Sequence, residues 1–407
     1  MGVADRMSAP QKAGERHGRR SLAAKVRYGA RVLPGLIRHQ SSRSRSKGRA
    51  HLVIALADHF EPAIVPGDGQ KRVPRDIQEQ RVERWCKEYP ALAREWRDCD
   101  GYPFQHTYFY PAEQFDAVLI DRLVEHCHEG WGEIGIHLHH GMDVPDTAEN
   151  TRRTIENFRS ELEERRCLSY FDGTEQPRYA FVHGNFALAN SVGGLMCGVD
   201  SEMQILAETG CYADLTLPAA PFSPAQVSKI NSLYECGLPL GRRAAHSTGV
   251  DLQVGRSAHV FPLVVQGPLL LTLHHGRPRI ENGALVGTNP PSMRRLHLWK
   301  RAAICVKGRA DWIFIKLHCH SMDPTHESSI LGDAMHSFLR ELVQGAAERN
   351  EVLHFCSARE MVNIALAACD DCEGNPGDFR DYRLKRFSER EVRRRTSMSN
   401  SEVVAKA

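Results

Sequence analysis

Residues 51–59, HLVIALADH, decide the fold prediction. Residues 52–57 are all apolar, and the run has the length of a strand. Charged residues precede it, and the turn-like stretch EPAIVPGDG (61–69) follows it. The stretch therefore predicts a buried strand that ends at Asp58 and His59.

Strand-like and helix-like segments alternate in the residues that follow. The predicted strands are 104–110, 133–138, 178–183, 212–218, 260–265, 269–274, 312–317 and 352–355, and the predicted helices are 77–98, 112–128, 146–167, 200–209, 328–348 and 357–368. This alternation indicates parallel strands joined by crossover helices. We expect an α/β protein, specifically a distorted (β/α) barrel of about seven parallel strands, with reactive side chains at the carboxyl ends of the strands.

Charge is unevenly distributed along the chain. Residues 1–50 contain 13 basic and two acidic residues, and residues 380–407 contain nine and four, so a net charge of +3 leaves −13 for the rest. An acidic body argues against a nucleic-acid enzyme, whose working groove carries positive charge. We expect a basic arm (1–50) that is disordered or lies on a membrane surface, a barrel (51–368) with a Pro/Gly-rich insertion at about 218–310, and a basic C-terminal tail (369–407).

The N-terminal residues and the cysteines bear on location. The N-terminus lacks the apolar segment of a signal peptide, and no apolar run is long enough to span a bilayer. Residues 21–38 could form a basic amphipathic segment on an anionic membrane, although Pro34 and Gly35 interrupt it. Twelve scattered cysteines favour reduced thiols. We expect a cytoplasmic protein, with peripheral membrane contact through the arm as an alternative.

Histidines and one aspartate cluster directly after the predicted strands. The chain has 21 histidines. Because the carboxyl ends of parallel strands meet at one rim, the following side chains are expected to converge: Asp58, His59, His106, His137, His139, His140, His183, His318 and His320.

Two of these positions indicate metal binding. His137 and His139 lie two residues apart, so they share one face of an extended chain and could chelate a divalent cation; a hydrogen-bonded pair is the alternative. An ionised Asp58 at the end of a buried strand is costly unless it is compensated, and a metal with an activated water would compensate it. Asp58 could otherwise be a turn residue.

Other strand-end residues have candidate roles in catalysis and substrate binding. His318 could act as a general acid, although the pair with His320 could also ligate metal. His183 and Asn185 could hold polar groups of a substrate, or form a turn. Asp214 could orient a histidine. The sequence contains neither a nucleophilic GxSxG nor a nucleotide-binding GxGxxG or P-loop motif.

The order of these motifs resembles the polysaccharide deacetylase-like (NodB-homology) superfamily over residues 50–360. The segment IALADHF (54–60) resembles the opening motif of that family, with Asp58 in the position of the catalytic base and His59 in that of a metal-binding aspartate. The segment EIGIH (133–137) is similar to the first half of the family's metal motif.

This resemblance implies a function and a set of site residues. Gly141 stands where the second family histidine is usual, so His139, or alternatively His140, is expected to replace it. The implied metal ligands are thus His59, His137 and His139. The implied activity is removal of an acetyl group from a sugar or polysaccharide precursor by a metal-activated water, with Asp58 as base and His318 as the acid that protonates the leaving group. Zinc suits the imidazole ligands.

Two other interpretations remain open. The same barrel could hydrolyse a different amide or a glycosidic bond; the latter needs a second carboxylate beside Asp58, for which Glu61, Asp143 and Asp214 are candidates. Alternatively, it could be an inactive barrel that binds a glycan or a protein. The sequence leaves the oligomeric state undetermined.

Overall fold

A computed structural model of the chain describes residue 35 and residues 48–386, except 186, 192, 219–228 and 275. The chain up to residue 47, apart from residue 35, and the chain beyond residue 386 lie outside the described residues. The expected N-terminal arm, its amphipathic segment 21–38 and most of the expected C-terminal tail fall there.

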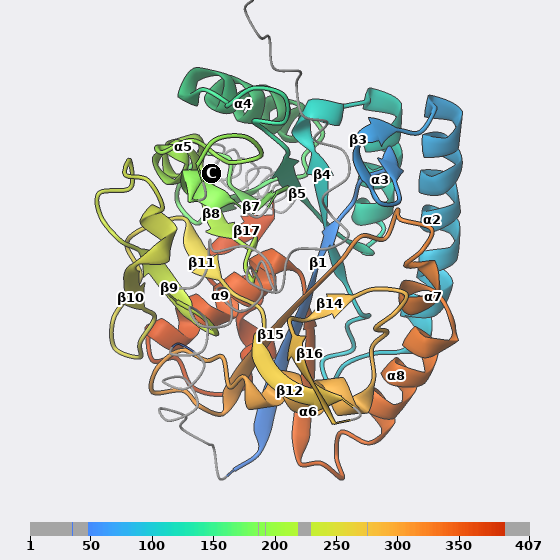
Figure 1. Ribbon diagram of the computed structural model, residues 1–407. Helices are drawn as coiled ribbons and strands as arrows, with labels where there is room; N and C mark the ends of the chain where they lie inside the picture. The colour runs from blue at the N-terminus through green and yellow to red at the C-terminus, as the bar shows by residue number, and fades with distance from the viewer. Residues whose placement is uncertain are drawn as a thin grey trace, which may run out of the picture.

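One large, mostly parallel sheet forms the centre of the molecule (Figure 1). Its strands lie in the spatial order β10 (Gly249–Asp251), β9 (Leu233–Cys236), β11 (Leu263–Val265), β8 (Cys211–Asp214), β7 (Tyr179–His183), β5 (Gly132–Leu138), β4 (His106–Pro111), β1 (Ala50–His59), β15 (Trp312–Cys319) and β14 (Ala284–Leu285). A further strand, β16 (Glu351–Cys356), pairs with the first half of β1, and β4 pairs with its second half. Among the described ladders of this sheet, only those that β9 forms with β10 and β11 are antiparallel.

The expected α/β class is confirmed, but closure of the sheet into a barrel is not. Among the described ladders, β10 and β14 stand at the two edges without joining each other. The segment predicted as a strand at 269–274 does not enter this sheet. It forms β12 (Leu270–His274), which pairs antiparallel with β13 (Arg277–Glu281) across a turn in which Gly276 has a φ of 74°. A positive φ of this size is readily adopted by glycine, so the chain reverses there.

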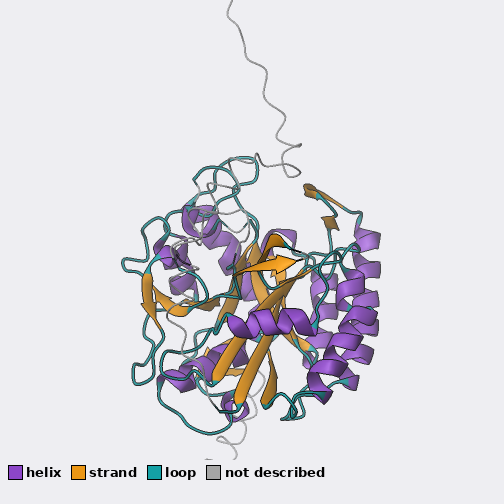
Figure 2. Cartoon of the chain, turned by 60° about the horizontal axis from the view of Figure 1, so that its bottom comes forward, coloured by secondary structure: helices purple, strands orange, loops and turns teal. Residues whose placement is uncertain are grey.

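Helices cover one face of the sheet and share a core with it (Figure 2). They are α2 (Arg75–Glu95), α3 (Ala117–His128), α4 (Ala148–Glu164), α5 (Glu202–Thr209), α6 (Met293–Arg301) and α8 (Asp333–Gln344). Side chains of Leu52, Ile54 and Leu56 from β1 point into this core. Successive strand residues face opposite sides, so Val53, Ala55 and Ala57 belong to a second core.

The second core is closed by α9 (Ala358–Cys369), in which every residue is buried. Ser357 caps this helix by accepting from the Glu360 backbone N–H, and the Glu360 side chain accepts from the Ser357 backbone N–H. This reciprocal capping satisfies two backbone donors that the first turn leaves without helical partners. The buried helix therefore fills the face of the sheet opposite α2 and α3.

Short elements complete the fold. They are β2 (Ile64–Val65), β3 (Asp68–Arg72), η2 (Ala112–Gln114), β6 (Ser169–Phe171), η3 (Leu188–Asn190), η5 (Ala245–Ser247), α7 (Glu327–Ile330), η6 (Pro376–Phe379) and β17 (Leu384–Arg386). No helix of the described residues has the length and apolarity needed to cross a bilayer.

Residues 370–386, which the sequence analysis assigned to the tail, pack into the fold. β17 pairs with β6, and the buried Arg380 contacts Asp98 at 2.6 Å and Asp100 at 3.1 Å. The region 218–310, expected as an insertion, contributes β9, β10 and β11 to the main sheet.

Asp100 gives this C-terminal packing a testable pH dependence. Burial alone would raise the pKa of Asp100, but hydrogen bonds from Asn375, His354 and Arg380 lower it to about 2. A lowered carboxyl pKa stabilises the fold above the unfolded value of about 3.9, and this stabilisation is lost as the pH falls toward 2. We expect wild type to lose about 2 kcal/mol between about pH 4 and pH 2 through this group. Acid unfolding followed by circular dichroism should show a flatter profile for Asp100→Asn; identical profiles would contradict the assignment.

Candidate metal centre

The carboxyl ends of β1, β5 and β15 bring histidines and one glutamate together. His59 is the last residue of β1, and Glu61 follows two positions later. His137 lies in β5 and His139 just beyond it, while His320 follows the end of β15. The three strands run parallel to their neighbours, so these ends share one edge of the sheet.

Glu61 lies at the middle of this group. Its Oε1 is 3.1 Å from His137 Nε2 and 2.9 Å from His139 Nε2, and its Oε2 is 3.0 Å from His320 Nδ1. Burial would raise the pKa of Glu61, but its close contacts with these imidazoles hold it well below its usual range. We refer to Glu61, His59, His137, His139, His320 and Glu113 as the Glu61 cluster.

The contacts of His137 indicate that a cation belongs beside Glu61. The Nδ1 atom lies 3.0 Å from the Val182 carbonyl oxygen, which can only accept, so Nδ1 carries the proton. Burial and the neighbouring His139 lower the pKa of His137, which favours the neutral ring. Its Nε2 lone pair then faces the Glu61 carboxylate, another acceptor. A cation between the two atoms removes this repulsion, so these residues fit a metal ion.

Glu113 holds the ring of His139 in place. Its Oε1 is 2.8 Å from His139 Nδ1, and its Oε2 accepts from the His139 backbone N–H at 3.3 Å. Burial would lower the pKa of His139, but the hydrogen bonds to Glu113 and Glu61 raise it to about 10. When one ring nitrogen of a histidine binds a metal or carries a proton, a carboxylate bonded to the other ring nitrogen commonly orients the imidazole.

His59 completes the candidate ligand set. Its ring centroid is 4.8 Å from that of His137 and 4.5 Å from that of His320. Burial and the nearby His320 lower the pKa of His59 well below its usual value, so its ring is neutral and able to ligate. One donor atom each from His59, Glu61 and His137 lie within 4.8 Å of one another, and all three residues are buried.

Three other groups of described residues also bring possible ligand atoms within 4.8 Å. They are Asp58, His106 and Cys319; Cys99, Asp100 and His354; and His140, His183 and Glu202. The structure therefore contains several clusters with the composition to hold a metal ion.

Asp58 does not join the Glu61 cluster. Successive residues of β1 face opposite sides, and Asp58 points to the helix-covered face whereas His59 points to the other. The Asp58 carboxylate, which is fully buried, lies 3.0 Å from His106 Nδ1 and accepts from the Ser321 backbone N–H at 2.9 Å. These contacts join the ends of β1, β4 and β15.

His318 lies near the cluster but is buried. Its ring centroid is 6.5 Å from that of His59. Burial and the neighbouring Lys316 lower the pKa of His318 well below its usual value. The side chain of His320, two residues later, is 26% exposed. Of these two histidines, His320 is the more exposed to solvent.

The residues predicted to bind substrate, His183, Asn185 and Asp214, form hydrogen bonds outside the Glu61 cluster. The fully buried His183 uses Nδ1 to accept from the Asn185 backbone N–H, and the Asn185 side chain donates to the Met142 sulfur. Asp214 is fully buried and accepts from the Thr216 hydroxyl at 2.7 Å. The structure therefore does not place these three side chains in the Glu61 cluster.

His140, next to His139, belongs to a separate ion-pair network. Its Nδ1 is 2.8 Å from Asp146 Oδ2, and its Nε2 is 3.0 Å from Glu202 Oε1. Both ring nitrogens therefore face acceptors, and the hydrogen bonds and charges of these carboxylates raise the pKa of His140 to about 9 despite the opposing effect of burial. The charged ring links the loop after β5 to α5, which is a structural role.

Sequence reasoning missed two members of the Glu61 cluster. Glu61 was considered only as a turn residue or a glycosidase carboxylate, and Glu113 was not considered. Glu61 lies two positions after His59, and Glu113 lies two positions after the end of β4. Their position just beyond a predicted strand is the one signal that could have identified them.

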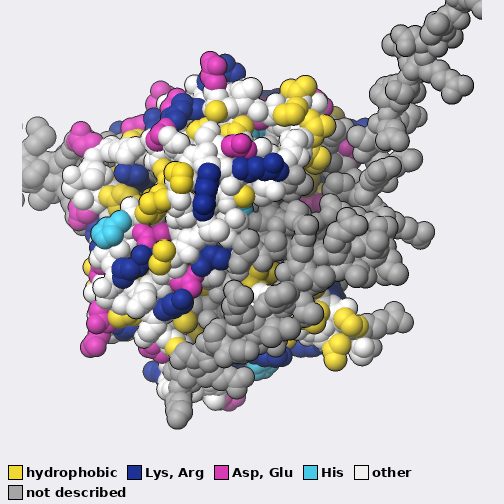
Figure 3. Space-filling model, turned by 60° about the vertical axis from the view of Figure 1, so that its left-hand side comes forward, with side chains coloured by type: hydrophobic (Ala, Val, Ile, Leu, Met, Phe, Trp, Pro, Cys, Tyr) yellow, Lys and Arg dark blue, Asp and Glu magenta, His cyan; other side chains and the backbone are white. Residues whose placement is uncertain are grey.

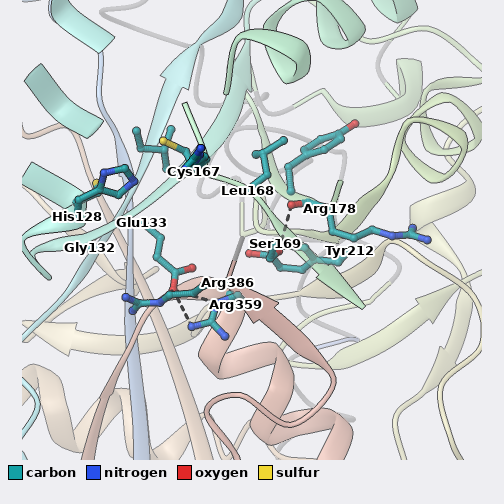
Figure 4. A pocket seen from close by; sticks show the side chains of 14 residues that line it. His128, Gly132, Glu133, Cys167, Leu168, Ser169, Arg178, Tyr212, Arg359 and Arg386 are labelled. Atoms are coloured by element: carbon teal, nitrogen blue, oxygen red, sulfur yellow. Dashed lines mark hydrogen bonds and ion pairs between the residues drawn. The ribbon is translucent and has the colours of Figure 1, made fainter. Parts of the chain in front are cut away.

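A cavity of about 330 Å³ lies at the amino ends of β5 and β7 (Figure 4). Its wall contains Glu133, four residues before His137 and so about 13 Å away along β5. The Glu133 carboxylate points toward Arg359 and is 2.9 Å from it, with Arg386 at 3.3 Å. This ion pair joins β5 to α9, and no imidazole lies among the residues that pair with Glu133 in the described part of the chain.

Comparison with models of known protein families finds no match to this chain, and neither does comparison with curated proteins.

Proposed function

We propose that the protein is a metal-dependent hydrolase that removes an acetyl group from a sugar or polysaccharide precursor. The observation that carries the proposal is the convergence of His59, Glu61 and His137 at the carboxyl ends of parallel strands. The resemblance of the motif order to polysaccharide deacetylases supplies the reaction class.

Zinc is the metal that this donor set favours. Two imidazole nitrogens and one carboxylate oxygen form a ligand set typical of catalytic zinc, which keeps a position open for water or substrate. A bound zinc ion would polarise the acetyl carbonyl and lower the pKa of its water.

The remaining members of the cluster are assigned to proton transfer. The side chains of His139, Glu113 and His320 are 18%, 22% and 26% exposed, so a substrate would approach from their side. The Glu113 carboxylate, held by the charged ring of His139, is placed to accept a proton, and His320 to return one to the leaving group. We assign the donor role to His320 rather than to the buried His318, and a positioning role to Asp58.

We further infer that the sheet is a distorted barrel whose last gap is bridged by side chains and loops. Lys316 of β15 donates from Nζ to the Leu215 carbonyl oxygen at 2.7 Å, just beyond the end of β8. Gly267, just beyond β11, lies so close to β15 that a Cβ there would be 2.4 Å from the Lys316 carbonyl oxygen. These contacts bring β8 and β11 against β15 without a ladder.

Metal analysis combined with an acetate-release assay tests this function. The purified full chain should hold about one equivalent of zinc and release acetate from at least one member of a panel of acetylated sugars. His137→Ala should lower the bound zinc at least about tenfold. The control His354→Ala removes a buried histidine of a different cluster and should leave the zinc content unchanged.

The outcomes separate the remaining interpretations. Zinc lost equally in both variants would contradict the Glu61 cluster as the metal centre. Stoichiometric zinc without acetate release on any substrate would favour an inactive, glycan- or protein-binding role over hydrolysis.

A further inference from the structure

The hairpin formed by β12 and β13 presents an apolar face to solvent. Its register places Leu271 opposite Ile280 and Leu273 opposite Pro278. Residues opposite each other in a ladder have their side chains on the same face. Leu271 and Leu273 are 44% and 62% exposed, Pro278 is exposed, and Ile280 is partly buried. We refer to these four side chains as the hairpin face.

The other side of the hairpin is anchored to the body. Leu270, which alternates with Leu271, is buried in the core. Glu281, opposite Leu270, is also buried and binds Arg295 at 2.7 Å and the Trp299 indole N–H at 3.0 Å. The hairpin therefore cannot turn over to bury its leucines, and the hairpin face stays outward.

A basic side chain of α6, Arg294, lies beside the hairpin. Arg294 donates to the Leu273 carbonyl oxygen at 2.6 Å, which places its guanidinium at the outer edge of β12. Arg301 lies seven residues, or about two turns, further along α6 on the same side. Both arginines are exposed, and neither forms an ion pair with any residue that the structure describes.

This combination differs from the face of the molecule drawn in Figure 3. There, Lys and Arg are interspersed with Asp and Glu, and apolar side chains occur in small groups among them. Such a mixed surface is ordinary for a soluble protein. The hairpin has four apolar side chains together, and Arg294, which forms no ion pair with any described residue, lies next to them.

We propose that the hairpin face and Arg294 and Arg301 dock the protein on an anionic lipid surface. Apolar side chains that enter the interface together with adjacent arginines are the features that bind anionic bilayers. The residues of this surface belong to 270–301 and not to the basic segment 1–50, and the proposal does not depend on the hydrolase activity.

Two observations favour lipid over a protein partner. A stable protein interface uses about 20–30 residues a side, and the hairpin face has four. A partner strand would need the free edge of β12, but Arg294 already occupies the Leu273 carbonyl oxygen there. A fluid lipid surface needs neither a large area nor a free edge.

Vesicle flotation of the full chain tests the proposal. The probes are vesicles of phosphatidylcholine alone and vesicles that also contain phosphatidylglycerol, each at low and high salt. High salt screens attraction by the basic arm, which has 13 basic and two acidic residues, but not insertion of apolar side chains. Wild type should therefore retain binding to phosphatidylglycerol vesicles at high salt, and Leu271→Ser/Leu273→Ser should reduce it about tenfold.

Matched controls isolate the hairpin. Leu238→Ser/Val250→Ser removes two apolar side chains that are exposed elsewhere and should bind as wild type does. Arg294→Gln should weaken binding at low salt more than Arg340→Gln, which removes an exposed arginine of α8. Leu273→Trp and Val250→Trp each add one tryptophan. Brominated phosphatidylcholine in the vesicles should quench the added fluorescence of Leu273→Trp but not that of Val250→Trp.

Three results would overturn the proposal. The first is equal binding by wild type and the leucine double variant at high salt. The second is no vesicle binding by wild type. The third is a wild-type dimer in sedimentation that the leucine double variant converts to monomer, because a second copy of the chain would then cover the hairpin face.

Discussion

Glu61→Gln should remove the metal and abolish acetate release while the protein stays folded. The glutamine keeps the shape of the side chain but loses the charge that three imidazole nitrogens approach at 2.9–3.1 Å. A neutral amide is a poor ligand for a divalent cation, and the amide N–H₂ would face histidines that also donate. Zinc content measured by mass spectrometry should fall at least about tenfold.

The control for this variant is Glu281→Gln, in which a buried carboxylate bound to Arg295 loses its charge elsewhere in the fold. This control should lower stability but not the zinc content of the folded fraction. Full zinc retention by Glu61→Gln would show that Glu61 is not a metal ligand. The cluster would then be interpreted as an ion-pair network of histidines around a carboxylate.

Asp58→Asn should destabilise the fold by about 3 kcal/mol and leave zinc bound, because it breaks a buried charged contact. Asp58 accepts from Ser321 and pairs with His106, so the substitution loosens the junction of β1, β4 and β15. Loss of a general base would lower the rate by about 10²–10⁴. Because we assign Asp58 a positioning role, we expect acetate release to fall less than about tenfold at temperatures where the variant is folded.

A double-mutant cycle makes the Asp58 prediction specific. If the carboxylate acts through His106, the destabilisation by Asp58→Asn and His106→Asn should be strongly non-additive in denaturant unfolding. A loss of activity of 10² or more with unchanged stability would instead establish Asp58 as the base, as the family resemblance implies.

The positions of the central strands, though not their closure into a barrel, were predictable because buried parallel strands leave a clear apolar signature. Residues 52–57 have no polar member, and the structure places them all within β1. This signature also explains the uncertainty over Asp58. A strand that is apolar on both faces gives no indication of which face its last residues take, so the sequence could not show that Asp58 and His59 point to opposite sides.

The members of the Glu61 cluster were predicted in part. His59, His137 and His139 follow apolar runs, and the structure brings them together. Glu61 and Glu113 escaped prediction because their partners are distant in the chain, such as His320, 259 residues from Glu61. A glutamate in a turn-like stretch looks the same in sequence whether it is solvated or lies at the centre of a site.

The C-terminal segment shows the same limitation. Arginine-rich composition resembles a solvated tail, but Arg380 is buried against Asp98, which lies 282 residues earlier. Local composition records the charge of such a residue and not its distant partner. Likewise, α9 is buried on all sides, so it has no polar face from which its position against the sheet could be read.

The buried helix α9 also restricts how a polymeric substrate could be handled. Every residue of α9 is buried, and the helix packs against the face of the sheet that also carries Val53, Ala55 and Ala57 of β1. On the proposed function, a substrate would reach the Glu61 cluster from the side of His139 and His320, whose side chains are 18% and 26% exposed. If the proposed function holds, a glycan would therefore bind and leave on that one side, and threading of a polymer through the fold is not expected.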